Sequence, residues 1–273
     1  MAIELGKLGI WRPYPGVDVH FATEAEKLGY GAIWLGASPT GDLAYVDDLL
    51  AATDHLVIAT GIVNIWQDEP ADIARVYERI AGKYPDRFLL GIGAGHREAT
   101  KEYKKPYAAL VDYLDGLDAA GVPVAGRALA ALGPKVVKLS GDRAAGAHPY
   151  LTTPEHTRST REILGAGKLL APEQKVVLGT DADETRAIGR NTVKYYLGLS
   201  NYVASLRKLG FTDEDLEGEG SDRLVDALAL HGDAETVARG VRAHLEAGAD
   251  HVNIQVLNED PWPAYQALAS ELL

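Results

Sequence analysis

The sequence predicts an α/β protein that folds as a (β/α)8 TIM barrel, with an extra helical excursion between strands seven and eight. Short β-rich runs alternate with longer helical patterns from end to end, which is typical of repeated βα units around a parallel sheet. The apolar runs Val57-Ile58-Ala59 and Val176-Val177-Leu178 contain no polar residue, as expected for strands covered on both faces. A length of 273 residues suits one barrel or two small domains. We expect a single barrel domain over residues 1–273.

The expected strands are taken in order along the chain, and they are residues 7–11, 32–35, 57–62, 88–92, 127–131, 146–148, 175–179 and 251–257. Helical spacing of apolar residues appears between them, for example over residues 17–28 and 234–247. Residues 146–148 form the weakest strand, and a sheet of six or seven strands would favour an open doubly wound fold instead. The connection from residue 179 to 251 is longer than one crossover helix requires. We therefore expect residues of about 190–232 to cover the barrel mouth or meet a partner subunit.

Composition excludes several classes of function. The chain has no cysteine, so disulfides, thiolate catalysis and cysteine-bound metal are absent. Its formal net charge of −12 disfavours general binding to nucleic acid or to an anionic membrane. Without a visible signal peptide or spanning segment, the expectation is a soluble cytoplasmic protein that acts on a small molecule.

The strand ends carry the candidate chemistry, because the sites of barrels assemble at the carboxyl ends of their strands. The fourth strand ends in Gly91-Ile92-Gly93-Ala94-Gly95-His96, where the glycines suit close approach of a flat ligand. His96 is either a general acid or base, or a histidine that caps the next helix or is hydrogen-bonded in the core. At the third strand, Gly61 interrupts a β-branched run, which marks a bulge or an ordinary packing glycine.

Two further strand ends suit an anion. Gly133-Pro134-Lys135 begins a helix after the fifth strand, so free backbone N–H groups there favour phosphate, although a plain strand-to-helix turn explains the residues equally well. After the sixth strand, Thr153 is placed as a helix N-cap before Pro154. No histidine forms a metal-binding spacing, and Asp250-His251 at a strand start is read as packing, so no metal is expected.

Taken together and in this order, the strand ends resemble the bacterial luciferase-like superfamily, in particular its branch that uses the deazaflavin coenzyme F420. The resemblance covers nearly the whole chain. It is carried by the fourth-strand stretch from Pro85 to His96, by segments 29–34, 59–64 and 130–135, and by segments 154–157 and 247–252. The expected Asp-His pair after the second strand is replaced by Gly36-Ala37-Ser38-Pro39, which makes His96 the first choice for proton transfer.

The resemblance implies a cofactor site at stated positions. A non-prolyl cis peptide at Gly61-Ile62 is expected to back the deazaflavin ring, and the turn from Ala131 to Lys135 to hold its phosphate. Lys138, Arg158 or Arg161 are candidates for the acidic tail, and Trp11, Trp66 and Tyr150 for the walls. The expected cofactor contacts are Gly61, Ile62, Asn64, Gly93, Ala130, Ala131, Gly133, Pro134, Lys135 and Thr153.

The function implied is an F420-dependent oxidoreductase that transfers hydride between the deazaflavin and a small organic substrate, with His96 handling the proton. The alternatives are an FMN-dependent monooxygenase of the same superfamily and a non-catalytic deazaflavin-binding protein. A sugar-phosphate lyase or isomerase on the same barrel would need a central lysine or paired carboxylates at strand ends, which the sequence lacks. Family habit and the aromatic segment from Tyr195 to Tyr202 predict a homodimer.

Overall fold

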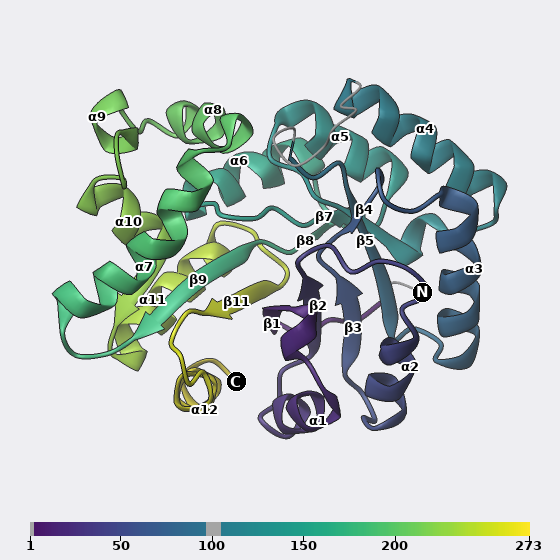
Figure 1. Ribbon diagram of the computed structural model, residues 1–273, viewed down its shortest axis with the longest axis horizontal. Coiled ribbons are helices and arrows are strands. Elements are labelled where there is room, and N and C mark those ends of the chain that lie inside the picture. Colours follow the sequence, from purple (N-terminus) through teal and green to yellow (C-terminus); the bar gives the residue numbers. More distant parts are fainter. Residues whose placement is uncertain (1–2, 97–104) are drawn as a thin grey trace.

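The structure is a computed structural model that describes residues 3–96 and 105–273. Its strands pair in parallel in the order β10-β9-β11-β1-β2-β3-β5-β6-β7-β8, with β4 beside β5 (Figure 1). The strands are β1 (Leu8–Pro13), β2 (Ala32–Gly36), β3 (Val57–Thr60), β4 (Val63–Asn64), β5 (Phe88–Gly93), β6 (Arg127–Leu129), β7 (Gly146–Ala147), β8 (Leu169–Leu170), β9 (Glu173–Leu178), β10 (Ala229–Gly232) and β11 (Val252–Val256).

The sheet curls back on itself at the junction of β8 and β9. Only Ala171 and Pro172 separate these two strands, and backbone hydrogen bonds flank them on both sides. Ala171 N donates to Ala147 O at 2.9 Å, and Asn253 N donates to Pro172 O at 2.9 Å. The same segment therefore lies between β7 and β11, and the predicted α/β class is confirmed as a curled, barrel-like parallel sheet.

The expected third strand, residues 57–62, ends early at Thr60, and a separate short strand, β4, begins at Val63. β3 ends at Thr60 because the Thr60 side chain, and not its backbone, makes the hydrogen bonds to β5. Gly91 N donates to Thr60 Oγ1 at 2.9 Å, and Thr60 Oγ1 donates to Gly91 O at 2.8 Å. A Cβ placed on Gly91 would lie 1.8 Å from Thr60 O, so only glycine permits this close approach. Gly61 and Ile62 are thereby displaced from the ladder between β3 and β4.

Three strands were not predicted: β4, β8 and β10. β8 has two residues, and β10 lies inside the segment 190–232 that was expected to be helical. β10 pairs with β9 over the register Ala229↔Lys175 to Gly232↔Leu178. Its sequence, Ala-Leu-His-Gly, is too short and too mixed in polarity to indicate a strand. The other predicted strands differ from the observed ones by at most two residues at either end.

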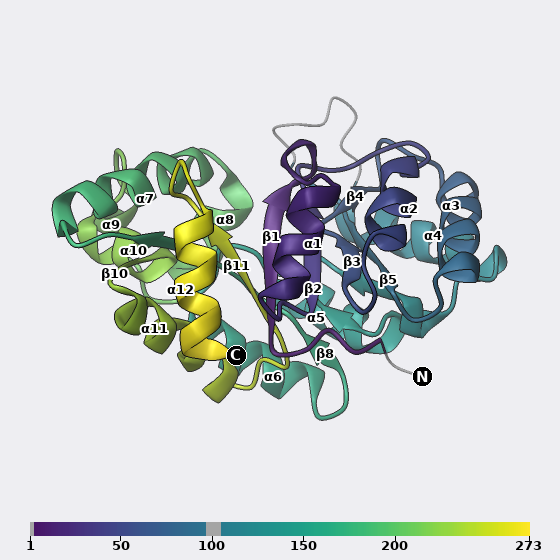
Figure 2. The ribbon, with the colours of Figure 1, turned by 90° about the horizontal axis from the view of Figure 1, so that it is seen from below.

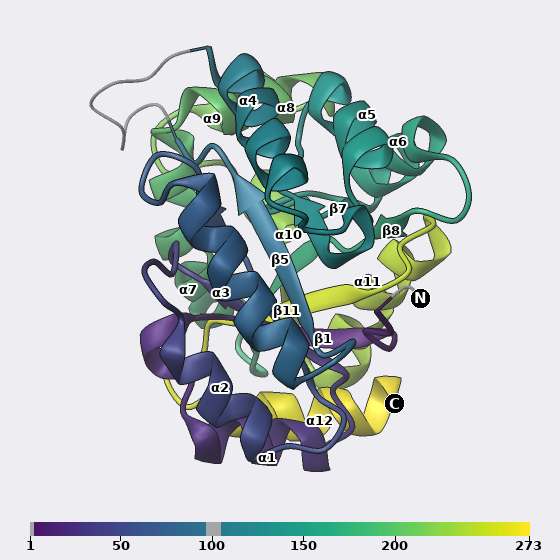
Figure 3. The same cartoon turned by 90° about the vertical axis from the view of Figure 1, so that its right-hand side faces the viewer.

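Helices cover the outer face of the sheet. They are α1 (Val19–Lys27), α2 (Ala44–Ala51), α3 (Pro70–Lys83), α4 (Pro106–Ala119), α5 (Pro134–Arg143), α6 (Pro154–Leu164), α7 (Ala182–Leu197), α8 (Ser200–Lys208), α9 (Asp213–Leu216), α10 (Asp222–Leu228), α11 (Ala234–Glu246) and α12 (Trp262–Leu272), with short 3-10 turns η1 (Tyr14–Gly16) and η3 (Val124–Gly126). Figure 3 shows α3 lying along the outside of β5. The C-terminal α12 lies beside α1, where Phe21 and Trp262 have ring centroids 4.9 Å apart (Figure 2).

The strands bury side chains on both faces. Ile33 and Leu35 of β2 belong to the large core between sheet and helices, and both are 0% exposed. Trp34, between them, belongs to a smaller cluster on the opposite face with Ala59. Because successive strand residues point to opposite faces, this second cluster fills the inside of the curled sheet.

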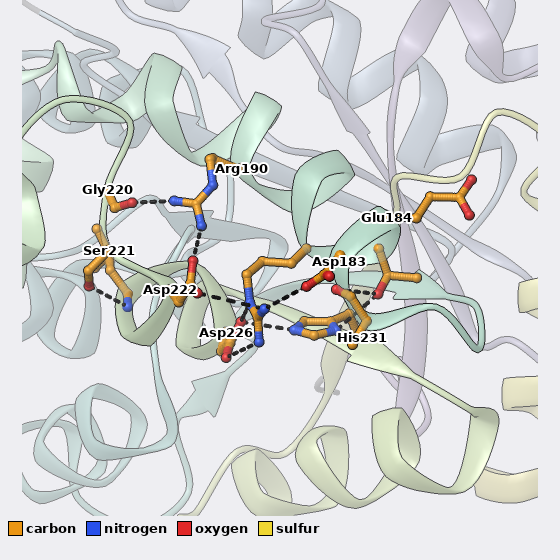
Figure 4. Close-up of polar contacts among 12 residues, drawn as sticks. Asp183, Glu184, Arg190, Gly220, Ser221, Asp222, Asp226 and His231 are labelled. Carbon is orange, nitrogen blue, oxygen red and sulfur yellow. Dashed lines mark hydrogen bonds and ion pairs between the residues drawn. The ribbon is translucent and has the colours of Figure 1, made fainter.

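Helices α7 to α10 form a layer beside β9 and β10, joined by ion pairs (Figure 4). Arg186 Nε lies 2.7 Å from Asp226 Oδ1, and His231 Nε2 lies 2.9 Å from the same oxygen. Arg190 pairs with Asp222. These contacts tie α7 to α10 and β10, and they are structural. In the described part of the chain, no helix is long and apolar enough to cross a membrane.

Candidate functional site

A cavity of about 970 Å³ opens at the carboxyl ends of the strands. Its walls include β1, the segments after β2, β3, β5, β6 and β7, and α8. Predicted site residues that line it are Gly61, Ile62, Asn64, His96, Ala130, Ala131, Gly133 and Pro134. Gly93, Lys135 and Thr153 do not line it. The topology thus brings most of the separate strand ends into one space.

One wall is formed by the displaced segment after β3. The peptide bond Gly61-Ile62 is cis, as predicted. Gly93 lies behind this wall, because a Cβ placed on it would be 3.0 Å from both Ile62 Cγ1 and Ala130 Cβ. Asn64 is 9% exposed and accepts a hydrogen bond from Trp66 N at 3.1 Å, which fixes its side chain at the cavity edge.

Another wall is the N-terminus of α5. Gly133 is its N-cap and provides no side-chain hydrogen bond, so the first-turn N–H groups receive no capping acceptor from that residue. His156 was given no role in the prediction, but it holds the turn that precedes α5, because its Nε2 donates to Leu132 O at 2.9 Å. Burial lowers the pKa of His156, which keeps the ring neutral, and Thr160 Oγ1 lies 3.2 Å from the remaining nitrogen. This end of the cavity suits an anion.

Two of the basic side chains that were expected near a bound anion form ion pairs with carboxylates instead. Lys138 pairs with Asp142 at 2.9 Å, and Arg161 pairs with Asp250 at 2.5 Å at the opposite end of the strands. Thr153 uses its hydroxyl to cap α6, accepting from His156 N at 3.5 Å. Lys208 of α8, which the prediction did not include, is exposed and lines the cavity. No sequence signal marked it, because α8 reaches the cavity only through tertiary packing.

The third wall is aromatic and rests on a buried ion pair. Glu173 and Lys175 are both 0% exposed, and Lys175 Nζ lies 3.0 Å from Glu173 Oε1. The ammonium lies 3.8 Å from the centroid of the Tyr150 ring. Tyr150 donates to Gln255 Oε1 at 2.9 Å and lies 2.8 Å from the Tyr196 hydroxyl. Burial raises the pKa of Tyr196 to about 12, so this hydroxyl stays protonated at neutral pH.

The floor beside Gly61 is lined by Trp11 and His148. His148 follows β7, is 2% exposed and stacks on Trp34 with ring centroids 4.1 Å apart. Burial lowers its pKa to about 4, which leaves the ring neutral at pH 7. Trp11, predicted as a wall, packs against Tyr150 with ring centroids 5.0 Å apart. Trp66, also predicted as a wall, is not among the lining residues and donates from Nε1 to Ala94 O at 2.7 Å.

His96 lies on the rim, where its ring centroid is 5.5 Å from that of Tyr202 in α8. The residues that follow it, 97–104, lie outside the described part of the chain. Its role in proton transfer stays a prediction. No group of three or more histidine, cysteine or carboxylate side chains able to hold a metal occurs among the described residues.

The arrangement can be compared with known proteins. Residues 17–121 match the family model described as luciferase-like monooxygenase. The predicted resemblance to this superfamily is confirmed. No curated protein matches the sequence. An F420-dependent secondary alcohol dehydrogenase in complex with an F420-acetone adduct is similar in structure to this chain, with a TM-score of 0.77, 15% identity and 98% of each chain covered.

Two further solved structures are similar. The coenzyme F420 dependent tetrahydromethanopterin reductase from Methanopyrus kandleri has a TM-score of 0.69 and 15% identity, covering 98% of this chain and 99% of the other. The oxygenating constituent of 3,6-diketocamphane monooxygenase from Pseudomonas putida, in complex with FMN, has a TM-score of 0.63 and 16% identity, covering 98% and 99%. At these identities the similarity shows a shared fold. It does not identify a cofactor for this chain.

Proposed function

We propose that this luciferase-like chain is an oxidoreductase that binds coenzyme F420 and transfers hydride between it and a small organic substrate. The observation that carries the proposal is one continuous cavity between the Gly61-Ile62 wall and the α5 N-terminus. A flat ring with a phosphate-bearing chain needs both features in one space. F420 is favoured over FMN because the F420-dependent structures resemble this fold more closely than the FMN-bound one.

The residues present have distinct roles in this proposal. Gly61 and Ile62 support the ring, Asn64 and Ala130 border it, and the backbone of Gly133 and Pro134 meets the phosphate. When bound, the deazaflavin accepts or supplies a hydride. Tyr150 and Tyr202 exclude water from the reacting groups. Their side chains move little when the ligands bind, because both rings are already packed against Tyr196. Exclusion of water matters because it strengthens polar contacts inside the cavity.

His96 is proposed to hold or move the proton that accompanies the hydride. We expect His96→Ala to lower the rate constant of the hydride-transfer step by about 100-fold or more while leaving cofactor affinity within about threefold. His20→Ala, on the exposed side of α1, is the matched control and should change neither quantity. Stopped-flow absorbance of the cofactor measures the rate. An unchanged rate in His96→Ala would exclude His96 from proton transfer.

Cofactor titration tests the proposal itself. The purified protein is titrated separately with oxidised coenzyme F420 and with FMN, and the quenching of cofactor fluorescence is followed. Saturable binding of F420 without binding of FMN is the expected result. Binding of FMN alone would support the FMN-dependent monooxygenase instead. Tight F420 binding with no turnover over a broad panel of alcohols, ketones and enones would support a cofactor-binding protein without activity.

Assembly and substrate size remain part of the proposal. We propose a homodimer that acts on a small molecule, and size-exclusion chromatography with light scattering measures the mass directly. A monomer at micromolar concentration, with or without F420, would contradict the proposed dimer.

A further inference from the structure

Two buried polar side chains line the cavity beside Gly61 with one atom each that has no hydrogen-bond partner among the described residues. They are Trp11, with Nε1 unpartnered and 7% of the residue exposed, and His148, with Nε2 unpartnered and 2% exposed. A buried polar atom without a partner is costly and uncommon. Two such atoms on one cavity wall indicate a ligand group that supplies the missing partners.

The two atoms have opposite hydrogen-bonding roles. The indole Nε1–H of Trp11 can only donate. His148 Nδ1 lies 2.7 Å from Ala171 O, and a carbonyl oxygen only accepts, so Nδ1 carries the proton. Because burial lowers the pKa of His148 to about 4, the ring is neutral at pH 7 and Nε2 is left as an acceptor. The wall therefore presents one donor and one acceptor.

The donor and the acceptor border the same spot. A Cβ built on Gly61 would lie 3.0 Å from Trp11 Nε1 and 3.3 Å from His148 Nε2. Both rings are also held in place: His148 by its bond to Ala171 and its stacking on Trp34, and Trp11 by its packing against Tyr150. A fixed pair of this kind pays little conformational entropy when it binds a ligand.

We propose that Trp11 and His148 bind a hydroxyl group of the organic substrate, whose oxygen accepts a hydrogen bond from Trp11 Nε1–H and whose O–H donates a hydrogen bond to His148 Nε2. A hydroxyl is a small group that offers an acceptor and a donor on one atom, whereas an ether or a ketone offers no proton to Nε2. The substrate class is therefore an alcohol. This inference rests on the proposed function in one respect, that the cavity takes an organic substrate beside a cofactor.

The test uses the full chain without cofactor, labelled with ¹⁵N in histidine and tryptophan, and nuclear magnetic resonance at pH 7. We expect His148 to carry its proton on Nδ1 and none on Nε2. Cyclohexanol should shift the His148 Nε2 and Trp11 Nε1 resonances saturably, and cyclohexyl methyl ether should not. A protonated Nε2, or equal responses to the alcohol and the ether, would overturn the proposal.

Variants separate the two contacts. Trp11→Phe keeps a ring but removes the donor, and His148→Asn keeps a donor near Ala171 O but removes the acceptor. Each should weaken cyclohexanol binding about tenfold, read from the remaining nitrogen of the pair. His244→Gln is the matched control, because burial lowers the pKa of His244 to about 4 as well, but His244 does not line the cavity. Cyclohexanol affinity should be unchanged in this control.

The N–H and C=O groups at the edge of the cofactor ring could also pair with His148 Nε2 and Trp11 Nε1. Titration with F420 alone tests this second assignment. If F420 without alcohol shifts both nitrogens, and both variants weaken F420 binding about tenfold, the ring occupies the pair and the substrate assignment is wrong. If neither F420 nor FMN binds while the response to cyclohexanol persists, the proposed function fails and the hydroxyl site stands. The two failures are therefore distinguishable.

Discussion

Replacement of Lys175 by methionine should destabilise the protein strongly, because it leaves the Glu173 carboxylate buried without its counter-ion. Both residues are 0% exposed, and Lys175 Nζ contacts the two carboxylate oxygens at 3.0 and 3.1 Å. After the substitution, the remaining donor to Glu173 among the described residues is Leu151 N at 3.0 Å. Breaking one partner of such a pair costs about 3–5 kcal/mol.

The double variant Glu173→Gln/Lys175→Met isolates the effect of the stranded charge. It also lacks the cation over the Tyr150 ring, but it retains an acceptor for Leu151 N and buries no net charge. The cost of a neutral unpartnered amide is about 1–3 kcal/mol. We therefore expect the double variant to regain about 2 kcal/mol relative to Lys175→Met, the difference between the middles of these two ranges.

The destabilisation should depend on pH. Burial raises the pKa of Glu173 even beside the lysine, and removing the lysine raises it further. A carboxyl group whose pKa is raised in the folded state destabilises that state when it is ionised. The loss is therefore full above the folded-state pKa, and it shrinks as the pH falls through that value toward about 4.3, the usual pKa of glutamate.

Guanidinium unfolding followed by far-ultraviolet circular dichroism, at pH 8 and pH 5.5, measures these differences. The expected order of stability at pH 8 is wild type, then the double variant, then Lys175→Met, with a smaller gap between the two variants at pH 5.5. Equal stability of the single and double variants at both pH values would refute the reasoning, since it would mean that Glu173 carries no uncompensated charge.

Three further predictions concern packing, pH and catalysis. Gly91→Ala places a Cβ 1.8 Å from Thr60 O and should lower the free energy of unfolding by about 3 kcal/mol. Gly82→Ala, whose new Cβ would have no atom within 4 Å, should raise the free energy of unfolding by about 0.5–1 kcal/mol. Similar unfolding midpoints for the two variants would contradict this prediction. Burial lowers the pKa of His244 to about 4, so stability should be lost as the pH falls from about 6.5 to 4, by up to about 3 kcal/mol, and His244→Gln should flatten that dependence in chemical unfolding. His96→Ala should slow the hydride-transfer step without loss of cofactor affinity, as measured by stopped flow beside His20→Ala.

Much of the site was predictable because local patterns placed its parts at strand ends. The apolar runs located the strands, and the parallel arrangement they implied brought Gly61, His96 and Gly133 to one edge of the sheet. The cis peptide at Gly61-Ile62 was expected from the resemblance and is present. Lys135 and Thr153 were also predicted as cofactor contacts from their positions after strands. They do not line the cavity: the Lys135 side chain is exposed, and the Thr153 hydroxyl caps α6.

By itself, the sequence determined the α/β class, the positions of most strands and the end of the sheet where the cavity opens, because these depend on hydrophobic periodicity and on glycines within a few residues of one another. Only the tertiary structure decided which polar groups face the cavity. Tyr150 and Gln255 are 105 positions apart yet hydrogen-bonded, and the free nitrogen of His148 is defined by a carbonyl 23 positions away. The orientation and protonation of these groups depend on burial and on non-local partners, which no local pattern encodes.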